Sequence, residues 1–466
     1  MKTSAFISAV FCVISISITP SFSQDKIAKR IDSVMQIANS RGIFNGNILV
    51  AKSNKILYQA SFGYADGTTK AKLNSRLIFD VGSVSKEFNG VGIMLLKERK
   101  MLSLDDPISQ FIPELPSWAK RVKVRHLINY TSGIPMLDTR GEENDSAMWA
   151  ALKHLDSLKF EPGTAYIYNH YNVFLQMRII EKVSGLPYAD FITKNLLIPC
   201  KMTTAVVDYP TEGRLIAKAF DNDFQPTPYA QGMSGWVRLS AEDLYKWTDA
   251  LDHYRLISKE SYRELAANFP GGESSLGTTG FEKDTLMWHQ HQGSNSNFEA
   301  LLYSLPQDSL VIILMTNNQQ MKVHGIRAAI LNVLNNQAVS VPKKSVYLQV
   351  RDKMLSDVGK GIAYYQMLKA DMQDSYDFSF EIGDLISSGK YLQRRKLYDN
   401  AIRIFTMAVQ LPAKPADISY GYELIAECYM SKAEKTQSLA FYKKAVETDP
   451  NNKNAQGMIA TLTNLK

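Results

Sequence analysis

The sequence predicts an α/β protein of the α+β type, in which an antiparallel sheet is flanked by helices and interrupted by a helical insertion. Strand-like alternation of apolar and polar residues occurs near the N-terminus and again far downstream, with helical patterns between the two. Beyond residue 341 the pattern is helical without clear strands. The simplest arrangement is a sheet built from both ends of one region, followed by an all-α repeat domain.

Five segments alternate in the manner of strands. They are residues 47–50, 56–62, 287–291, 298–304 and 310–315. Residues 53–55 connect the first two segments and residues 305–308 connect the last two, and both connections contain residues that favour tight turns. Helical patterns such as residues 88–99 and 172–183 occupy the interval, so we expect a sheet with a helical insertion.

Length and composition indicate a soluble globular protein of two or three domains. The chain has 466 residues, of which 45% are apolar and 21% are charged. Its net charge of +7 is small for this length. The most basic stretch, residues 120–125, alternates with apolar residues rather than forming a continuous basic surface, so we expect no nucleic-acid partner.

The first 23 residues resemble a secretory signal peptide. Lys2 precedes an uncharged and largely apolar stretch, and residues 21–23, Ser-Phe-Ser, suit cleavage before Gln24. The apolar stretch is short for a membrane span, which needs ~20 residues. We therefore expect an exported protein, periplasmic or secreted, with no integral membrane span after cleavage.

Residues 342–466 are predicted to form a helical domain of tetratricopeptide-like repeats, separate from residues 24–341. Two segments share an aromatic residue followed three positions later by alanine, namely Phe405 with Ala408 and Tyr442 with Ala445. Their offset of 37 residues is close to the usual tetratricopeptide period of ~34. An ordinary helical bundle is the alternative. Repeats of this kind would offer a surface for a protein partner.

Ser83 and Lys86 form a Ser-x-x-Lys pattern whose surroundings distinguish it from others in the chain. The same spacing begins at four other serines, which are Ser23, Ser117, Ser340 and Ser387. Only Ser83 follows a strand-like segment and a glycine and then opens an amphipathic helix. The pattern is therefore weak alone, and its local setting gives it weight.

The physical chemistry of that setting suits nucleophilic catalysis. Residues three apart on a helix share a face, so Lys86 can place its amine beside the Ser83 hydroxyl. A serine needs a base to become a nucleophile, and a lysine whose pKa is lowered by burial can be that base. The helix N-terminus adds N–H groups and a positive field where an oxyanion would form. The alternative is a helix-capping serine followed by a solvated lysine.

Residues 79–88, which contain Ser83, resemble the nucleophile motif of the serine β-lactamase and penicillin-binding-protein superfamily. Residues 102–107 and 126–133 also resemble stretches of its class C-like branch, which includes D-alanyl-D-alanine carboxypeptidases, D-aminopeptidases and esterases. The resemblance covers about residues 30–335 with the motifs in the family's order. It implies that residues 24–341 form a serine hydrolase domain with Ser83 as nucleophile.

The second motif of that superfamily is Tyr-x-Asn. Tyr168 follows a Pro-Gly-Thr sequence and matches the tyrosine that relays a proton between nucleophile and leaving group. His170 stands where asparagine is usual. By resemblance His170 would help to bind substrate, and its protonation would add pH dependence. For Tyr168 the alternative is an ordinary core aromatic residue.

The third motif is Lys-Thr-Gly, or His-x-Gly in many class C-like members, and residues 291–293 fit the second form. Gly293 would allow the strand edge to approach the acyl group closely. By resemblance, the backbone N–H groups of Ser83 and Ser294 would form the oxyanion hole, and His291 would belong to the substrate pocket.

The sequence predicts no metal and no cofactor. His289 and His291 would lie on the same face of a strand, but a His-x-His-x-Asp metal motif would need an aspartate where Gly293 stands. Cys200 and Cys428 are far apart and indicate no disulfide framework, so we expect them to pack as small apolar residues.

Two functions remain open from the sequence. The first is an exported serine hydrolase that forms an acyl-enzyme on Ser83 with an amide, ester or peptide, including D-amino-acid peptides or esters. His291 in place of lysine is a poor partner for a substrate carboxylate at neutral pH, which argues against a dedicated β-lactamase. The alternative is a catalytically weak sensor or binding protein with a partner-recruiting tail, motivated by His170 and by Asn297, which stands where the family often has glycine.

Overall fold

The computed structural model describes residues 21–137, 144–208, 215–227 and 232–464. Most of the predicted signal peptide, residues 1–20, lies outside these ranges. The first helix, α1 (Ser21–Ser40), begins before the predicted cleavage site at Gln24. None of the described helices combines the length and the hydropathy that crossing a lipid bilayer requires.

The main sheet has six antiparallel strands and confirms the predicted fold class. Its strand order is β2-β1-β9-β8-β7-β6. The strands are β1 (Gly46–Lys52), β2 (Lys55–Phe62), β6 (Thr278–Glu282), β7 (Thr285–Asn295), β8 (Phe298–Leu305) and β9 (Leu310–Thr316). Because β1 pairs with both β2 and β9, the N-terminal hairpin joins the strands from the far end of the region.

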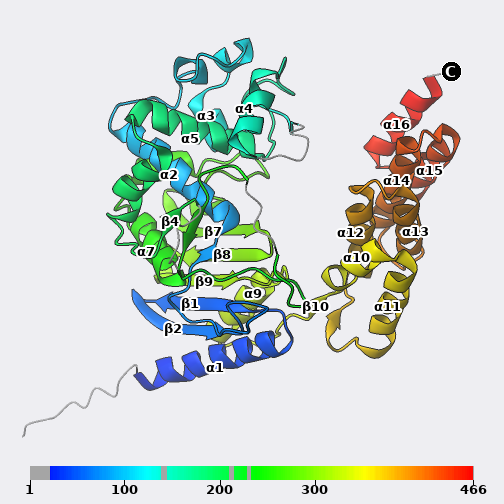
Figure 1. The fold of residues 1–466 in the computed structure, drawn as a ribbon, viewed down its shortest axis with the longest axis horizontal. Coiled ribbons are helices and arrows are strands. Elements are labelled where there is room, and N and C mark those ends of the chain that lie inside the picture. Colours follow the sequence, from blue (N-terminus) through cyan, green and yellow to red (C-terminus); the bar gives the residue numbers. More distant parts are fainter. Residues whose placement is uncertain (1–20, 138–143, 209–214, 228–231, 465–466) are drawn as a thin grey trace, which may run out of the picture.

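Both faces of this sheet are covered, as Figure 1 shows for the helices around it. On one face α1 and α9 (Val323–Leu334) pack against residues such as Ile48 and Leu314. On the other face the helical insertion packs against residues such as Leu49 and Ile313. Since successive strand residues point to opposite faces, β1 and β9 are apolar along nearly their whole length rather than alternating.

The insertion between β2 and β6 is mainly helical. Its helices are α2 (Lys86–Glu98), α3 (Val124–Ile128), α4 (Asp145–Lys153), α5 (His170–Ser184), α6 (Tyr188–Ile192), α7 (Ala241–Asp252) and α8 (Lys259–Leu265). A small antiparallel sheet of order β3-β5-β4 also lies there, formed by β3 (Phe79–Asp80), β4 (Val206–Val207) and β5 (Val237–Leu239). Four short helical turns complete the described elements of this region, namely η1 (Gly82–Ser85), η2 (Ile108–Gln110), η3 (Ser117–Lys120) and η4 (Thr193–Leu197), and a further turn, η5 (Pro306–Asp308), connects β8 with β9.

The C-terminal part is helical and has cores of its own. Its elements are β10 (Lys344–Ser345), α10 (Val346–Ser356), α11 (Val358–Asp371), β11 (Tyr376–Asp377), α12 (Glu381–Gln393), α13 (Tyr398–Ala408), α14 (Pro415–Ser431), α15 (Lys435–Thr448) and α16 (Lys453–Asn464). Their buried side chains form clusters that include no described residue of the six-stranded main sheet. The boundary at residue 342 stays a prediction, and this separation of cores agrees with it.

The two similar segments of this tail fall on α13 and α15. Ala408 and Ala445 are fully buried in them. Phe405 packs so closely on Gly389 of α12 that a Cβ there would lie 2.3 Å from its ring. The helices thus pack through small residues, as repeat helices do. That they are tetratricopeptide repeats stays a prediction.

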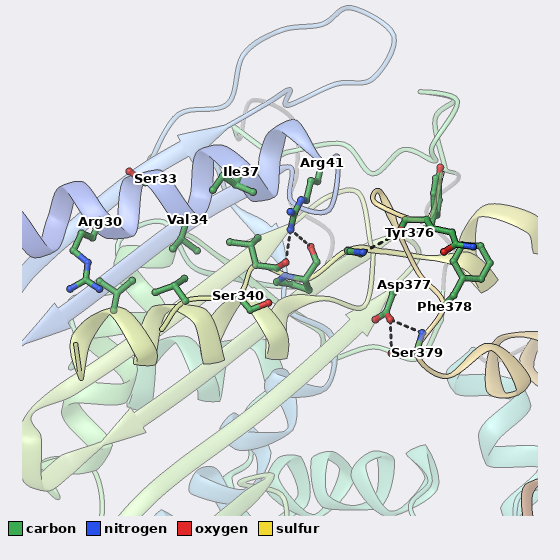
Figure 2. A pocket seen from close by; sticks show the side chains of 16 residues that line it. Arg30, Ser33, Val34, Ile37, Arg41, Ser340, Tyr376, Asp377, Phe378 and Ser379 are labelled. Atoms are coloured by element: carbon green, nitrogen blue, oxygen red, sulfur yellow. Dashed lines mark hydrogen bonds between the residues drawn. The ribbon is translucent and has the colours of Figure 1, made fainter. Parts of the chain in front are cut away.

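A large cavity marks the junction of the two parts. It has a volume of about 890 Å³ and lies between α1, residues 339–343 and the segment around β11. Figure 2 shows Arg41 donating hydrogen bonds to the carbonyl oxygens of Val341 and Pro342 on its wall. An ion pair of 3.3 Å between Lys322 and Asp377 adds a second link between the parts.

Candidate active site

The structure brings Ser83, Lys86 and Tyr168 together in one hydrogen-bonded chain. Ser83 lies in the turn η1, which runs directly into α2, so Lys86 is one helical turn further along. The Lys86 Nζ atom donates to Ser83 Oγ at 2.8 Å, and Ser83 Oγ lies 2.7 Å from Tyr168 Oη. The spacing of three residues therefore produces the contact that the sequence predicted.

Buried polar contacts hold the turn that carries Ser83. Gly82 has a φ of +51°, which a residue without Cβ adopts at little cost. Its N–H donates to the Asp80 carboxylate at 2.8 Å, and the buried Arg238 forms an ion pair with Asp80 at 3.3 Å. These contacts fix the backbone immediately before the nucleophile, so the Ser83 hydroxyl has a defined direction.

Burial prepares Lys86 to act as a base. Its side chain is only 1% exposed, and burial lowers its pKa to about 7 against the opposing charge of Glu273. Its Nζ atom lies 4.8 Å from the centre of the Tyr168 ring. A large fraction of the amine is therefore neutral near pH 7 and free to accept a proton. Burial raises the pKa of Tyr168, so this phenol keeps its proton.

The edge of β7 meets the Ser83 turn at two glycines. A Cβ on Gly293 would lie 2.0 Å from Val81 O and 2.5 Å from Ser83 N. A Cβ on Gly82 would lie 2.4 Å from Ser294 N. Only glycine permits this approach. The N–H groups of Ser83 and Ser294 thus belong to the same narrow junction, as an oxyanion hole requires, and that role stays a prediction.

His291 does not line the cavity next to Ser83, contrary to the position that we expected. It is 2% exposed, and its Nδ1 atom lies 2.9 Å from the buried Glu87 carboxylate. His289 faces the same carboxylate at 3.0 Å. Side chains alternate between the two faces of β7, so residues 289, 291 and 293 share one face while Gln290 and Gln292 occupy the other. This places Gln290 and Gln292, rather than His291, in the lining of the cavity.

His170 lies beside Tyr168 but in a separate small cavity. It is the first residue of α5, capped by Asn169, and its ring centre lies 5.5 Å from that of Trp236. Burial and then the charge of Lys86 lower its pKa to about 3. The imidazole is therefore neutral near neutral pH, and the pH dependence that we expected from it does not follow.

The cavity that opens on Ser83 has a volume of about 360 Å³ and contains residues that sequence reasoning missed. Besides Ser83 and Tyr168, its lining comprises Glu273, Thr278, Gln290, Gln292 and His324. The alternation of side chains along β7 could have predicted that Gln290 and Gln292 share one face of the strand. Glu273 is distant in sequence from Ser83. The only local sign of its role is that it follows Gly271 and Gly272, which favour a turn.

A sequence profile of the beta-lactamase family matches residues 27–335. The chain belongs to the beta-lactamase family. This confirms the predicted superfamily, whose members use a serine nucleophile, and it covers the whole region that contains the Ser83 cavity.

Curated relatives of this beta-lactamase-family chain include penicillin-binding proteins. One from Bacillus subtilis is 34% identical over 185 residues, which cover 37% of this chain and 40% of the relative. The Bacillus subtilis protein PbpX is 27% identical and matches 68% of this chain and 82% of its own length. The chain thus spans about two fifths of the first relative and about four fifths of the second.

Solved structures of the family share the fold. The chain is similar to FmtA from Staphylococcus aureus, with a TM-score of 0.58 and 20% identity over 69% of this chain and 92% of FmtA. A class C beta-lactamase gives a TM-score of 0.59 with 18% identity, over 69% of this chain and 99% of the other. D-amino acid amidase from Ochrobactrum anthropi gives 0.55 with 18% identity, over 67% and 99% of the two chains.

Proposed function

We propose that this chain is an exported serine hydrolase that forms an acyl-enzyme on Ser83 with an amide, ester or peptide substrate. The observation that carries the proposal is the chain of short contacts from Lys86 Nζ to Ser83 Oγ to Tyr168 Oη. A nucleophile, a base of suitable pKa and a proton donor are the components of acyl transfer.

The proposed reaction has two halves. Neutral Lys86 accepts the Ser83 proton as Oγ bonds to the substrate carbonyl carbon, and the oxyanion lies near the N–H groups of Ser83 and Ser294. The intermediate then collapses, the bond to the leaving amine or alcohol breaks, and Tyr168 delivers a proton to that group. Lys86 passes the proton taken from Ser83 to Tyr168, so the amine is neutral and the phenol protonated again. Water attacks the ester on Ser83 in the same manner, releases the acid and restores the free hydroxyl.

The substrate class is supported by the family and by the cavity. The relatives include penicillin-binding proteins, class C beta-lactamases and a D-amino acid amidase. Two glutamine side chains line the cavity, and its described lining contains no lysine or arginine to bind a substrate carboxylate. Amides, esters and peptides without an essential carboxylate therefore fit best. Export is proposed from residues 1–23 and is tested by comparing periplasmic and cytoplasmic fractions.

Labelling with a fluorophosphonate probe tests the acyl-enzyme. We expect one covalent adduct by intact mass spectrometry in the wild-type chain and none in Ser83→Ala. Ser117→Ala is a matched control, because Ser117 has the same Ser-x-x-Lys spacing on an exposed turn. No adduct with the probe, together with no hydrolysis of 4-nitrophenyl esters, would favour the sensor or binding protein.

A further inference from the structure

The cavity beside Ser83 has an unbalanced charge distribution. Glu273 contributes a carboxylate to its lining, and within the described part of the chain no lysine or arginine belongs to that lining. His324 is the remaining basic group there, and burial followed by the charge of Arg327 lowers its pKa, so it is neutral near pH 7. A bound substrate therefore lies next to the negative charge of Glu273.

The position of Glu273 is set by the turn that carries it. Gly271 has a φ of +75°, and Gly272 packs on the Tyr166 ring so tightly that a Cβ would lie 2.6 Å from it. Behind the turn, the N–H of Ser275 donates to Ile128 O at 2.8 Å, which anchors the segment to α3. The Glu273 side chain is half-buried, so its carboxylate lies in a defined and partly desolvated place.

The charged side chains behind this lining form hydrogen bonds with its two glutamines. Arg327 donates to the Gln290 side chain and lies 4.6 Å from the centre of the Tyr303 ring. Gln292 in turn donates to the buried Glu299 at 3.2 Å. Among the ion pairs of the described ranges, none involves Glu273. The negative charge of Glu273 raises the pKa of Lys86, but the opposite effect of burial is larger.

We propose that Glu273 determines substrate specificity by binding the protonated amine of a cationic substrate in the Ser83 cavity. A carboxylate accepts strong, charge-assisted hydrogen bonds from an ammonium group and repels a substrate carboxylate. The inference rests on the proposed acyl-enzyme and names its substrate class, which is an ester, amide or peptide with a free amine near the bond that is cleaved.

Protection from fluorophosphonate labelling tests this specificity. The competing ligands are phenylalaninamide and its N-acetyl and N-succinyl forms, which are cationic, neutral and anionic, each as both enantiomers. For the wild-type chain we expect the free-amine form to protect at about tenfold lower concentration than the neutral form. Glu273→Gln removes that preference, and Glu273→Lys transfers it to the N-succinyl form. Glu282→Gln, on an exposed position of β6, keeps it.

Calorimetric titration of Ser83→Ala with the same three amides measures binding without the covalent step. If the probe fails to label the wild-type chain, and binding still favours the free amine only when Glu273 is present, the proposed acyl-enzyme is wrong and the inference about Glu273 stands. Normal labelling with equal protection by all three ligands would overturn the inference alone. It would also be overturned if Glu273→Gln shifted the pH midpoint of labelling without altering the preference, since Glu273 would then act only through Lys86.

Discussion

Two helical turns of this chain carry the same Ser-x-x-Lys spacing in different surroundings. In the turn from η1 into α2, Ser83 is half-buried, Lys86 is buried, and the two side chains are hydrogen-bonded to each other. In η3, Ser117 and Lys120 are both exposed. The spacing is identical, and only burial and neighbouring groups differ.

This difference shows that the environment creates the chemistry. Desolvation lowers the pKa of Lys86 to about 7, and Tyr168 supplies the second contact to the Ser83 hydroxyl. An exposed lysine keeps its charge in water and cannot accept a proton at neutral pH. Variants that remove one element of the Ser83 environment while leaving the exposed pair intact therefore test the comparison directly.

The largest effect is expected from removing the base. Lys86→Met keeps the length of the side chain but loses the amine, so we expect the rate of fluorophosphonate labelling to fall by about 10²–10⁴-fold. Lys120→Met, in the exposed pair, should leave the rate unchanged. A loss of less than about tenfold in Lys86→Met would show that another group deprotonates Ser83.

A smaller effect, on stability, is expected from the buried network beneath the catalytic helix. Burial alone would raise the pKa of Glu87, but the charge and hydrogen bonds of His289 and His291 lower it to about 2. Its carboxylate also accepts from Trp247 Nε1 at 2.7 Å. We expect Glu87→Gln to lower the free energy of unfolding by about 3 kcal/mol, measured by urea denaturation. Ser83→Ala serves as the control and should remain near wild-type stability.

The pH dependence of labelling should report Lys86. Because the neutral amine is the active form, the rate should rise with pH, level off above about 7, and fall about tenfold for each unit below that value. Glu273→Gln removes a carboxylate that raises this pKa, so the midpoint should move to lower pH. A rate that is constant between about pH 5.5 and 9 would contradict the role of Lys86.

The smallest effect is expected from removing the helical tail. Its cores are separate from those of the sheet, so a chain that ends at Val341 should label at Ser83 within about threefold of the full-length rate. The tail could affect the Ser83 site through one cavity of about 140 Å³, which is lined by α10 and by Asn297 in the turn after β7. A large loss of labelling would mean that the tail shapes the cleft.

Local and periodic features of the molecule were predictable from the sequence, and its long-range contacts were not. The strands at both ends of the region and the Ser83–Lys86 contact follow from periods of two and of three to four residues. The same period of two places His291 inside and Gln292 in the cavity, but the family motif directed attention to the histidine. Glu273 reaches the cavity only through tertiary packing of its turn, which no local pattern encodes.

The strand order of the main sheet also has a consequence for how the chain folds. β1 becomes an interior strand only when β9 pairs with it, and α1 needs α9 to complete their shared core. Contacts between segments so distant in sequence form slowly, because a long loop must close first. During synthesis, β1 therefore cannot complete its pairing until β9, which ends at Thr316, has been made. The contact of Ser83 with β7 likewise cannot form before the second half of the domain has been made. The nucleophile is thus assembled late, and a partly synthesised chain should be inactive.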